Sequence, residues 1–299
     1  MFDCSAYLTH IMGELDFPAE AMECLSNSLD RVLNNATARE ILFRDLDRYE
    51  QDIHLSYRDV LVDMEHVAEM TGVHRWKTEL ILFLLYSKHL REVYLSRNVD
   101  LSIFHDSMLD LKWKLLECYA VKRMWGCFCA LWFPGFFSFD RFALGRLQFE
   151  LIPFTHAEFR QGGKVLKKGD PVINVHIPRT LTPLDGASCD TAFAMARSFF
   201  SDRLGDTPAA FYCYSWLLYP AYDTFLPETS NIRAFRSRFS ILGQQDDGED
   251  EHPDLWRLFD ADYTGDPYDL PGDTSLRRSF REYLIQGGKT GNGYGVFFA

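Results

Sequence analysis

The stretch PVINVHIP, residues 171–178, is a short apolar run bounded by prolines, and it predicts a buried β-strand. Downstream, a run with small residues on one face predicts a helix over roughly Ser188–Leu204 that can lie close to a sheet. The apolar run AAFYCYSWLLYP (209–220) predicts a second strand, and SNIRAFRSRF (230–239) predicts a helix with Ser230 as its N-cap. Strands and helices mixed in this way predict an α/β or α+β sheet domain.

The segments on either side extend the predicted sheet. FALGRLQFELIPF (142–154) has extended, partly alternating character. Near the end of the chain, Thr274–Gln286 reads as a helix, Gly291-Asn292-Gly293 as a turn, and Tyr294–Phe298 as a final buried strand. The stretch GQQDDGEDEHPD (243–254) predicts a solvated acidic loop.

The N-terminal half has a different pattern. Helical stripes run through Tyr57–Thr71, Trp76–Ser96 and Ser107–Gly126, and the middle one is apolar on every side near its centre, as in a helix buried within a bundle. No strand signal occurs in this half. We therefore predict an α+β protein with a helical domain at 1–132 and a mixed β-sheet domain with flanking helices at 133–299.

Charge and composition exclude several classes of partner. The net charge of −12 argues against nucleic acid, which needs clustered Lys and Arg, and equally against anionic membrane surfaces. The longest apolar stretch, Met124–Phe139, is shorter than the roughly 20 residues of a membrane span and contains Gly and Pro. We expect a protein without nucleic-acid or membrane partners.

The cysteine pattern and the N-terminus predict a cytoplasmic location. The seven cysteines include no Cys-x-x-Cys pair, and Cys127 and Cys129 lie in an apolar run where buried free thiols are common. The N-terminus MFDCSAYLTH lacks a basic region followed by an apolar segment, so we expect no signal peptide. These features are typical of a reducing cytosol.

Familiar catalytic and binding motifs fail on spacing. Gly288-Lys289-Thr290 lacks the earlier glycine of a phosphate-binding loop, since Tyr283 stands in its place. Gly186–Asp190 begins like a nucleophile elbow, but Asp190 replaces the last glycine, which disfavours a serine hydrolase. The nine histidines never fall at metal-ligand spacing, so we expect no metal.

The order of elements between 142 and 243 resembles the acyl-CoA-binding core of the GNAT N-acyltransferases, and Asn231-x-x-Ala234 with a later Gly243 is similar to their second-helix pattern. Nearly the whole chain resembles a two-domain bacterial group that joins a helical N-acyltransferase N-terminal domain to a GNAT-like C-terminal domain. The stretches that carry this resemblance are GRLQFEL (145–151), VHIP (175–178), SWLLYP (215–220), SNI with Phe235 (230–235) and LPGDTSLRRSFREYL with the later GG and GYGV (270–296).

The resemblance implies transfer of an acyl group from an acyl-CoA thioester to an unidentified amine or other acyl acceptor of small-molecule size. The pantetheine arm of CoA would insert between two splayed parallel strands, Val172–Ile177 and Ala209–Leu217. Backbone N–H groups near Val175 and Ile177 would hold the thioester carbonyl and stabilise the oxyanion. The helical domain would cover the acceptor site or form a homodimer contact.

The same resemblance places the CoA pyrophosphate at the N-terminus of the helix after the first strand, near Ala187 and Ser188, with Arg179 in the preceding loop. Here the chain departs from the family pattern. The segment RTLTPLDGAS has the wrong spacing, and Asp185 and Asp190 put negative charge where phosphate should bind. This departure supports a second hypothesis, a non-catalytic GNAT-derived protein that binds a ligand or partner.

Three residues are candidates for proton transfer. His176 lies in an otherwise apolar strand. It is either a catalytic base or a core histidine that is hydrogen-bonded to a backbone carbonyl. Glu150 is either a base or part of the wet face of an edge strand. The family's usual acid, a tyrosine, would fall near Arg238 and Phe239 in this chain; among its tyrosines Tyr214 is our candidate, while Tyr219 and Tyr222 stay open.

The remaining candidates contact cofactor or substrate, or have purely structural roles. Ser215 would bond to substrate or satisfy a backbone group. Asn231 would contact the pantetheine amide or share the capping role of Ser230. The local basic patch of Arg233, Arg236 and Arg238 would meet phosphate or keep its helix hydrated.

Overall fold

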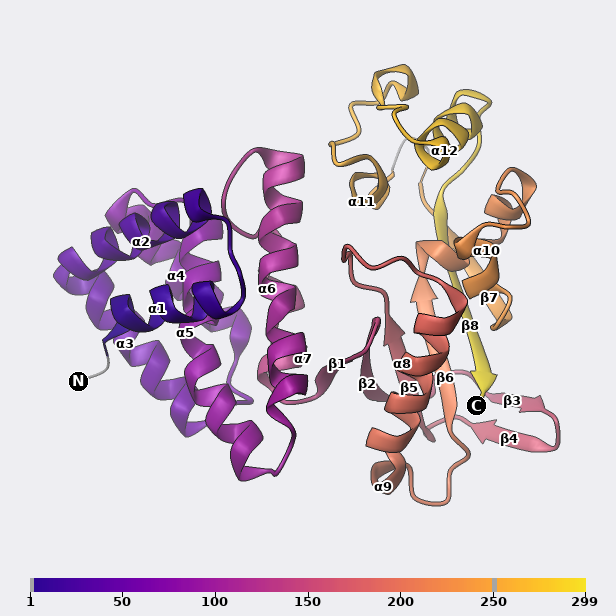
Figure 1. The fold of residues 1–299 in the computed structure, drawn as a ribbon, viewed down its shortest axis with the longest axis horizontal. Helices are drawn as coiled ribbons and strands as arrows, with labels where there is room; N and C mark the ends of the chain where they lie inside the picture. Colours follow the sequence, from indigo (N-terminus) through magenta and orange to yellow (C-terminus); the bar gives the residue numbers. More distant parts are fainter. Residues whose placement is uncertain (1–2, 249–251) are drawn as a thin grey trace. The chain divides into compact units, whose positions relative to one another are not determined.

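The computed structural model describes residues 3–248 and 252–299. The chain forms two compact units, Met1–Phe142 and Ala143–Ala299, and each is described by itself (Figure 1). The first is helical and the second holds a mixed sheet with flanking helices, which confirms the predicted fold class. The predicted domain division between residues 132 and 133 stays a prediction.

The helical unit is built around one central helix. Helix α5 packs against α1, α2, α3, α4 and α6. Its residues 78–87 are all buried, as its all-round apolar pattern predicts. The helices of this unit are α1 (Cys4–Glu14), α2 (Ala19–Asn34), α3 (Ala36–Gln51), α4 (Tyr57–Thr71), α5 (Arg75–Ser96), α6 (Leu101–Lys122), the 3₁₀ helix η1 (Ala130–Trp132) and α7 (Pro134–Phe137).

Capping side chains set several of these helix ends. The side chain of Asn35 accepts a hydrogen bond from the N–H of Ala38 at 3.0 Å and starts α3 directly after α2. Asp100 caps α6 in the same way, so this helix begins before the predicted Ser107. It ends at Lys122, because Arg123 adopts a left-handed conformation with φ of 54°. Within the described residues, no helix is both long and apolar enough to cross a bilayer.

The chain's main sheet has six strands in the order β1-β2-β5-β6-β8-β7, and β3 and β4 form a separate hairpin. All of these strands lie in the second unit except β1, which begins two residues before it. Strands β5 and β6 run parallel, whereas β2 pairs with β5, and β8 with β6 and β7, in antiparallel fashion. The strands are β1 (Arg141–Leu144), β2 (Leu147–Pro153), β3 (Glu158–Gln161), β4 (Lys164–Lys167), β5 (Pro171–His176), β6 (Ala210–Ser215), β7 (Ser240–Asp246) and β8 (Gly291–Phe298).

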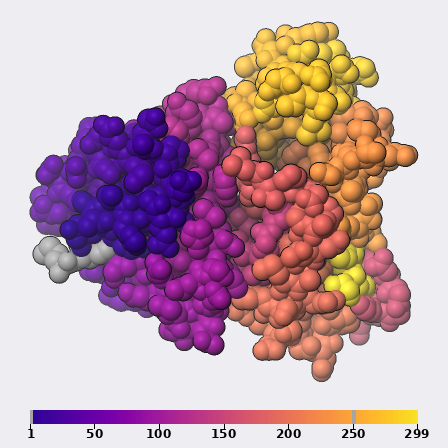
Figure 2. Space-filling view, in the orientation of Figure 1, coloured from indigo at the N-terminus to yellow at the C-terminus, as the bar shows by residue number. Residues whose placement is uncertain are grey.

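Helix α8 covers one face of this sheet. Its Phe193 contacts the rings of Phe149, Phe211 and Phe297, from three different strands, at centroid distances of 4.7 to 6.0 Å. In the space-filling view, atoms of this helix lie over the sheet on the visible face (Figure 2). The helices of this unit are α8 (Gly186–Phe199), α9 (Ser201–Leu204), η2 (Trp216–Leu218), η3 (Pro220–Thr224), α10 (Asn231–Arg236), α11 (Leu255–Phe259), η4 (Pro267–Asp269) and α12 (Ser275–Ile285).

The opposite face of the sheet has its own small core. Val172, Ala210 and Val296 come from β5, β6 and β8 and pack with the buried Phe154 and Leu166, which lie before β3 and in β4. Because side chains alternate along a strand, residues two and four positions further along β5 and β6 also belong to this face. A further core around α12 contains Tyr219, Tyr222, Leu226, Leu255, Phe259, Leu270, Phe280 and Leu284.

Three local predictions are wrong. The strand predicted over 209–220 ends at Ser215, whose side chain accepts from the N–H of Leu217 and starts a 3₁₀ turn. Gly291–Gly293 belong to β8 rather than to a turn, and glycine is needed there because a Cβ on Gly293 would overlap the backbone oxygen of Leu218. The predicted acidic loop begins inside β7; its residues 249–251 lie outside the described residues.

Candidate active site

The parallel strands β5 and β6 pair over only a short length. Their ladder consists of Ile173↔Phe211 and Asn174↔Tyr212. Beyond this point β5 stays with β2 up to His176, and β6 stays with β8 up to Ser215. The two strands therefore separate at their carboxyl ends. We call the opening flanked by residues 175–176 and 213–215 the wedge.

A polar cluster lies at the end of β5. Nε2 of His176 is 2.7 Å from Oε1 of Glu150 on β2, and the amide nitrogen of Asn174 donates to the same Oε1 at 3.0 Å. The side chains of His176 and Glu150 are only 18% and 15% exposed. The two residues proposed separately as bases therefore form one hydrogen-bonded pair.

The position of this cluster follows from strand alternation. Phe149 and Phe211 point to the α8 face, where they contact Phe193. Glu150 follows Phe149 directly, so its side chain lies on the opposite face, and the contacts above bring His176 to the same side. The cluster thus borders the wedge on the sheet face that α8 does not cover.

Tyr214 borders the wedge from the other strand. It lies two residues beyond the last paired residue of β6, just as His176 does on β5. Its side chain is 47% exposed, and its hydroxyl donates to Oε1 of Gln245 at 3.0 Å. Burial, assisted by the charges of Asp247 and Asp254, raises the pKa of Tyr214, so its proton is retained at neutral pH.

The alternative tyrosines are engaged elsewhere. Tyr219 is 2% exposed and its hydroxyl donates to Asp246 at 2.8 Å. Tyr222 is 3% exposed and packs in the core around α12. Burial raises the pKa of both phenols, so both are protonated, but neither borders the wedge.

The N-terminus of α8 follows the loop after β5. Asp185 caps it, since its carboxylate accepts from the N–H of Ser188 at 2.8 Å. This bond, with a contribution from the N–H of Ala187, lowers the pKa of Asp185. The amide groups expected to hold a pyrophosphate therefore already face a carboxylate of this chain.

Arginines surround this helix end. Arg238 donates to the C=O of Gly186 at 3.1 Å and forms an ion pair with Asp190. Arg146 donates to the C=O groups of Pro178 and Thr182, both at 2.9 Å, and so holds the loop between β5 and α8.

The other predicted phosphate contacts lie elsewhere. Arg179 is bonded to Asp260, with one contact at 2.9 Å. Arg236 pairs with Asp223, and Arg233 donates to the C=O of Leu226 at 3.0 Å. Of the predicted basic patch, only Arg238 reaches the α8 N-terminus.

The remaining predicted residues are Val175 and Ile177 at the end of β5, Ser215 at the end of β6, and Asn231 at the start of α10. Val175 is buried beside the wedge and Ile177 directly follows β5. Ser215 accepts from the N–H of Leu217 at 3.2 Å. Asn231 is the exposed first residue of α10, which Ser230 caps through the N–H of Ile232.

Sequence reasoning missed Asn174 and Arg146. Asn174 stands two residues before His176 in a strand otherwise apolar, and two polar residues at this spacing share one face of a strand. That spacing is a signal that could have found Asn174. For Arg146 the sequence offers no comparable signal, because its partners lie more than 30 residues away.

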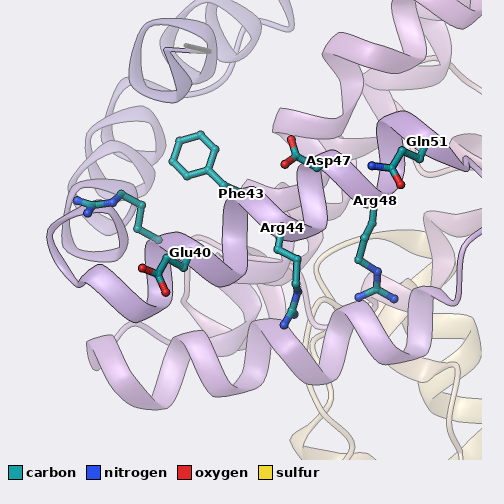
Figure 3. Close-up of a pocket in the computed structure, with 7 residues that line it drawn as sticks. Glu40, Phe43, Arg44, Asp47, Arg48 and Gln51 are labelled. Atoms are coloured by element: carbon teal, nitrogen blue, oxygen red, sulfur yellow. The ribbon is translucent and has the colours of Figure 1, made fainter.

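A second hollow lies in the helical unit along α3, with a volume of about 490 Å³ (Figure 3). Two of its arginines form ion pairs: Arg44 contacts Asp63 at 2.5 Å, and Arg48 contacts Asp45 at 3.0 Å and Asp63 at 3.3 Å. Figure 3 shows both guanidinium groups on the same side of α3. The third arginine, Arg39, donates to the C=O of Leu33 at 3.0 Å, and the carboxylates of Glu40 and Asp47 also line the hollow. Its positive charges are therefore offset, which does not favour an anion.

Comparison with known proteins shows the family of this chain. The family model of the N-acyltransferase N-terminal domain matches residues 6–139, and that of the GNAT-like C-terminal domain matches residues 142–297. The chain belongs to this two-domain N-acyltransferase family. A search of curated proteins gives no match.

Solved structures of an acyltransferase share the fold of this family member. One, in complex with decanoyl-CoA, aligns with a TM-score of 0.74 at 19% identity, covering 97% of this chain and 86% of that one. Another, in complex with decanoyl-CoA and teicoplanin, aligns with a TM-score of 0.75 at the same identity and coverage. At this identity the likeness establishes the fold.

Proposed function

We propose that this protein transfers an acyl group from an acyl-CoA thioester to an amine on a small-molecule acceptor. The observation that carries the proposal is the wedge, where a parallel ladder ends after Asn174↔Tyr212 beside a partly buried His–Glu pair. Membership in the N-acyltransferase family and the acyl-CoA complexes of the solved acyltransferases support it. The teicoplanin complex of a solved acyltransferase supports an acceptor of small-molecule size and leaves the identity of the amine open.

In this proposal the thioester lies in the wedge, with its carbonyl oxygen near the backbone N–H groups of Val175 and Ile177. The amine nitrogen attacks the carbonyl carbon, and a tetrahedral oxyanion forms. When this intermediate collapses, the carbon–sulfur bond breaks, and the products are an amide and free CoA. Tyr214 protonates the leaving thiolate, because its phenol retains its proton at neutral pH.

His176 is the base that accepts the proton of the attacking amine. In this proposal Nε2 carries the proton that it donates to Glu150, and Nδ1 accepts the proton of the amine. The carboxylate also stabilises the imidazolium that forms after proton transfer. Asn174 donates to the same carboxylate oxygen and fixes its position.

The CoA phosphates would bind at the N-terminus of α8, near Ala187, Ser188 and Arg238. Here the carboxylate of Asp185 competes with them for the amide groups. We therefore expect CoA to bind more weakly than in a site where these amides are unoccupied. Ser215 and Asn231 would lie along the pantetheine arm.

The test has a binding arm and a turnover arm. The full chain is incubated with acyl-CoAs from acetyl to decanoyl, and the melting temperature is measured with and without each one, since a ligand that binds the native state raises it. Free CoA and amide are then measured by mass spectrometry with a panel of amines. The absence of any thermal shift would refute the proposal, whereas a shift without turnover would favour a non-catalytic binding protein.

Variants separate binding from chemistry. His176→Gln should lower the rate of acyl transfer by about 10²–10⁴-fold and leave the acyl-CoA-induced thermal shift in place. The matched control is His66→Gln, the same change on the exposed face of α4. Turnover by the His176 variant equal to that of the control would exclude this histidine as the base.

A further inference from the structure

Two cysteines in the helical unit lie close together between α6 and α7. The sulfur atoms of Cys127 and Cys129 are 3.7 Å apart. The N–H of Cys127 donates to the C=O of Trp76 at 3.0 Å, which anchors this segment to the first turn of α5. A Cβ on the preceding Gly126 would lie 3.0 to 3.1 Å from Trp76, so the two backbones are in close contact.

The surroundings of the two thiols differ. Cys127 is fully buried, whereas Cys129 is partly exposed. The hydrogen bond from Cys127 and the charge of Lys114 lower the pKa of Cys129, although burial and the carboxylates of Glu117 and Asp110 act against this. Burial raises the pKa of Cys127. Cys129 is thus the better thiolate, and Cys127 keeps its proton and donates it in a hydrogen bond.

A buried ammonium group acts on both thiols and favours the thiolate form of each. Lys114 is 6% exposed and forms an ion pair with Glu117 at 2.8 Å. Its ammonium group lies 5.7 Å from the ring centre of Trp132, whose own N–H donates to Asp110 at 2.8 Å. This network fixes a positive charge beside the two thiols within the helical unit.

Cys129 also lines a hollow of about 350 Å³ that is open to small molecules. Val62 and Leu131, which are 50% and 60% exposed, form part of its wall. Its charged residues are Arg58, Arg75, Glu65 and Glu79, and Arg75 is paired with Glu65 at 2.9 Å. The apolar part of this wall suits an organic hydroperoxide, and hydrogen peroxide is small enough to enter the same hollow.

We propose that Cys129 is a peroxide-reactive thiol and that Cys127 resolves the product into a disulfide. In the first step the sulfur of Cys129 attacks the peroxide, the O–O bond breaks, and Cys129 becomes a sulfenic acid while the peroxide is reduced to an alcohol or water. In the second step the thiol of Cys127 displaces water and the disulfide forms. The sulfur atoms must approach by about 1.7 Å to reach the ~2.05 Å of a disulfide.

The first experiment uses the wild-type full chain. The protein is treated with hydrogen peroxide or cumene hydroperoxide at pH 7, alkylated, and digested with trypsin, which places both cysteines on one peptide spanning 124–141. We expect this peptide to become two hydrogens lighter and to resist alkylation until it is reduced. Cys24, which is also partly exposed, is the internal comparator. Its free thiol should disappear on the order of tenfold more slowly than that of Cys129.

Variants test the order of events. In Cys127→Ser, dimedone should trap a sulfenic acid on Cys129, because the resolving thiol is absent. In Cys129→Ser, Cys127 should stay reduced. The proposal is overturned if Cys129 of the wild-type chain reacts no faster than Cys24, or if dimedone labels Cys127 in preference to Cys129. The wild-type result is independent of how well either variant folds.

Discussion

Replacing Glu79 with glutamine should make the protein more stable at neutral pH and leave its stability nearly unchanged in acid. Glu79 lies on α5 with a side chain that is only 8% exposed, and its nearest cation, Arg75, is 3.8 Å away. Burial outweighs the attraction of Arg75 and raises the pKa of Glu79 from 4.5 to about 7.

The sign follows from comparing the native and unfolded states. Below pH 4.5 both states hold the proton and the carboxyl group has no effect on folding. As the pH rises towards 7, the unfolded chain releases its proton while the native protein retains it, so the free energy of unfolding falls. At about 1.36 kcal/mol per pH unit, this loss reaches about 3 kcal/mol near pH 7 and stays constant above it.

The assay is urea denaturation of wild type and Glu79→Gln at pH 4.5, 6 and 8, followed by far-ultraviolet circular dichroism. We expect the stability advantage of the variant to grow with pH, from near zero to as much as about 3 kcal/mol. Glu69→Gln, on the exposed face of α4, is the matched control. An advantage that does not change between pH 4.5 and pH 8 would refute the reasoning.

Three further predictions concern other sites. Lys114→Met should cost about 3–5 kcal/mol in urea denaturation by leaving Glu117 buried and unpaired, and Lys114→Met combined with Glu117→Leu should recover most of it. Gly293→Ala should lower the melting temperature, since its Cβ would overlap the backbone oxygen of Leu218. Asp185→Asn keeps the cap of α8 but removes a charge, so calorimetry should show CoA binding more tightly than to the wild type.

Much of the fold could be predicted because its signals are local. The strand in PVINVHIP and the buried helix α5 both follow from runs of apolar residues bounded by breakers. Helix α3 is not among the helices predicted, although Ala38, Leu42, Leu46 and Tyr49 recur at helical spacing and are buried against the other helices of the unit. The strand at Gly291–Gly293 resembles a turn in sequence, because its glycines are required by a distant oxygen on Leu218.

The sequence identifies His176 and Glu150 as candidates for the site, but it does not show how their side chains are arranged. His176 and Glu150 each stand out as polar residues in apolar strands, but their contact depends on the register between β2 and β5. A shift of one residue would move Glu150 to the α8 face and break the pair. The place of Arg179 in the loop predicts a phosphate contact, and nothing local in the sequence points to Asp260, which lies 81 residues further along.

The charges at the N-terminus of α8 are less of an obstacle to CoA than the sequence suggests. Asp190 is 67% exposed, and an exposed ion pair such as the one it forms with Arg238 contributes only about 0–1 kcal/mol. Arg238 can therefore exchange this carboxylate for a phosphate at little cost, and its second contact, to the C=O of Gly186, holds it at the helix end. Asp185 is different, because its bond to the N–H of Ser188 is a helix cap that phosphate would have to replace. In the proposed phosphate site, Asp185 therefore opposes CoA binding more strongly than Asp190 does.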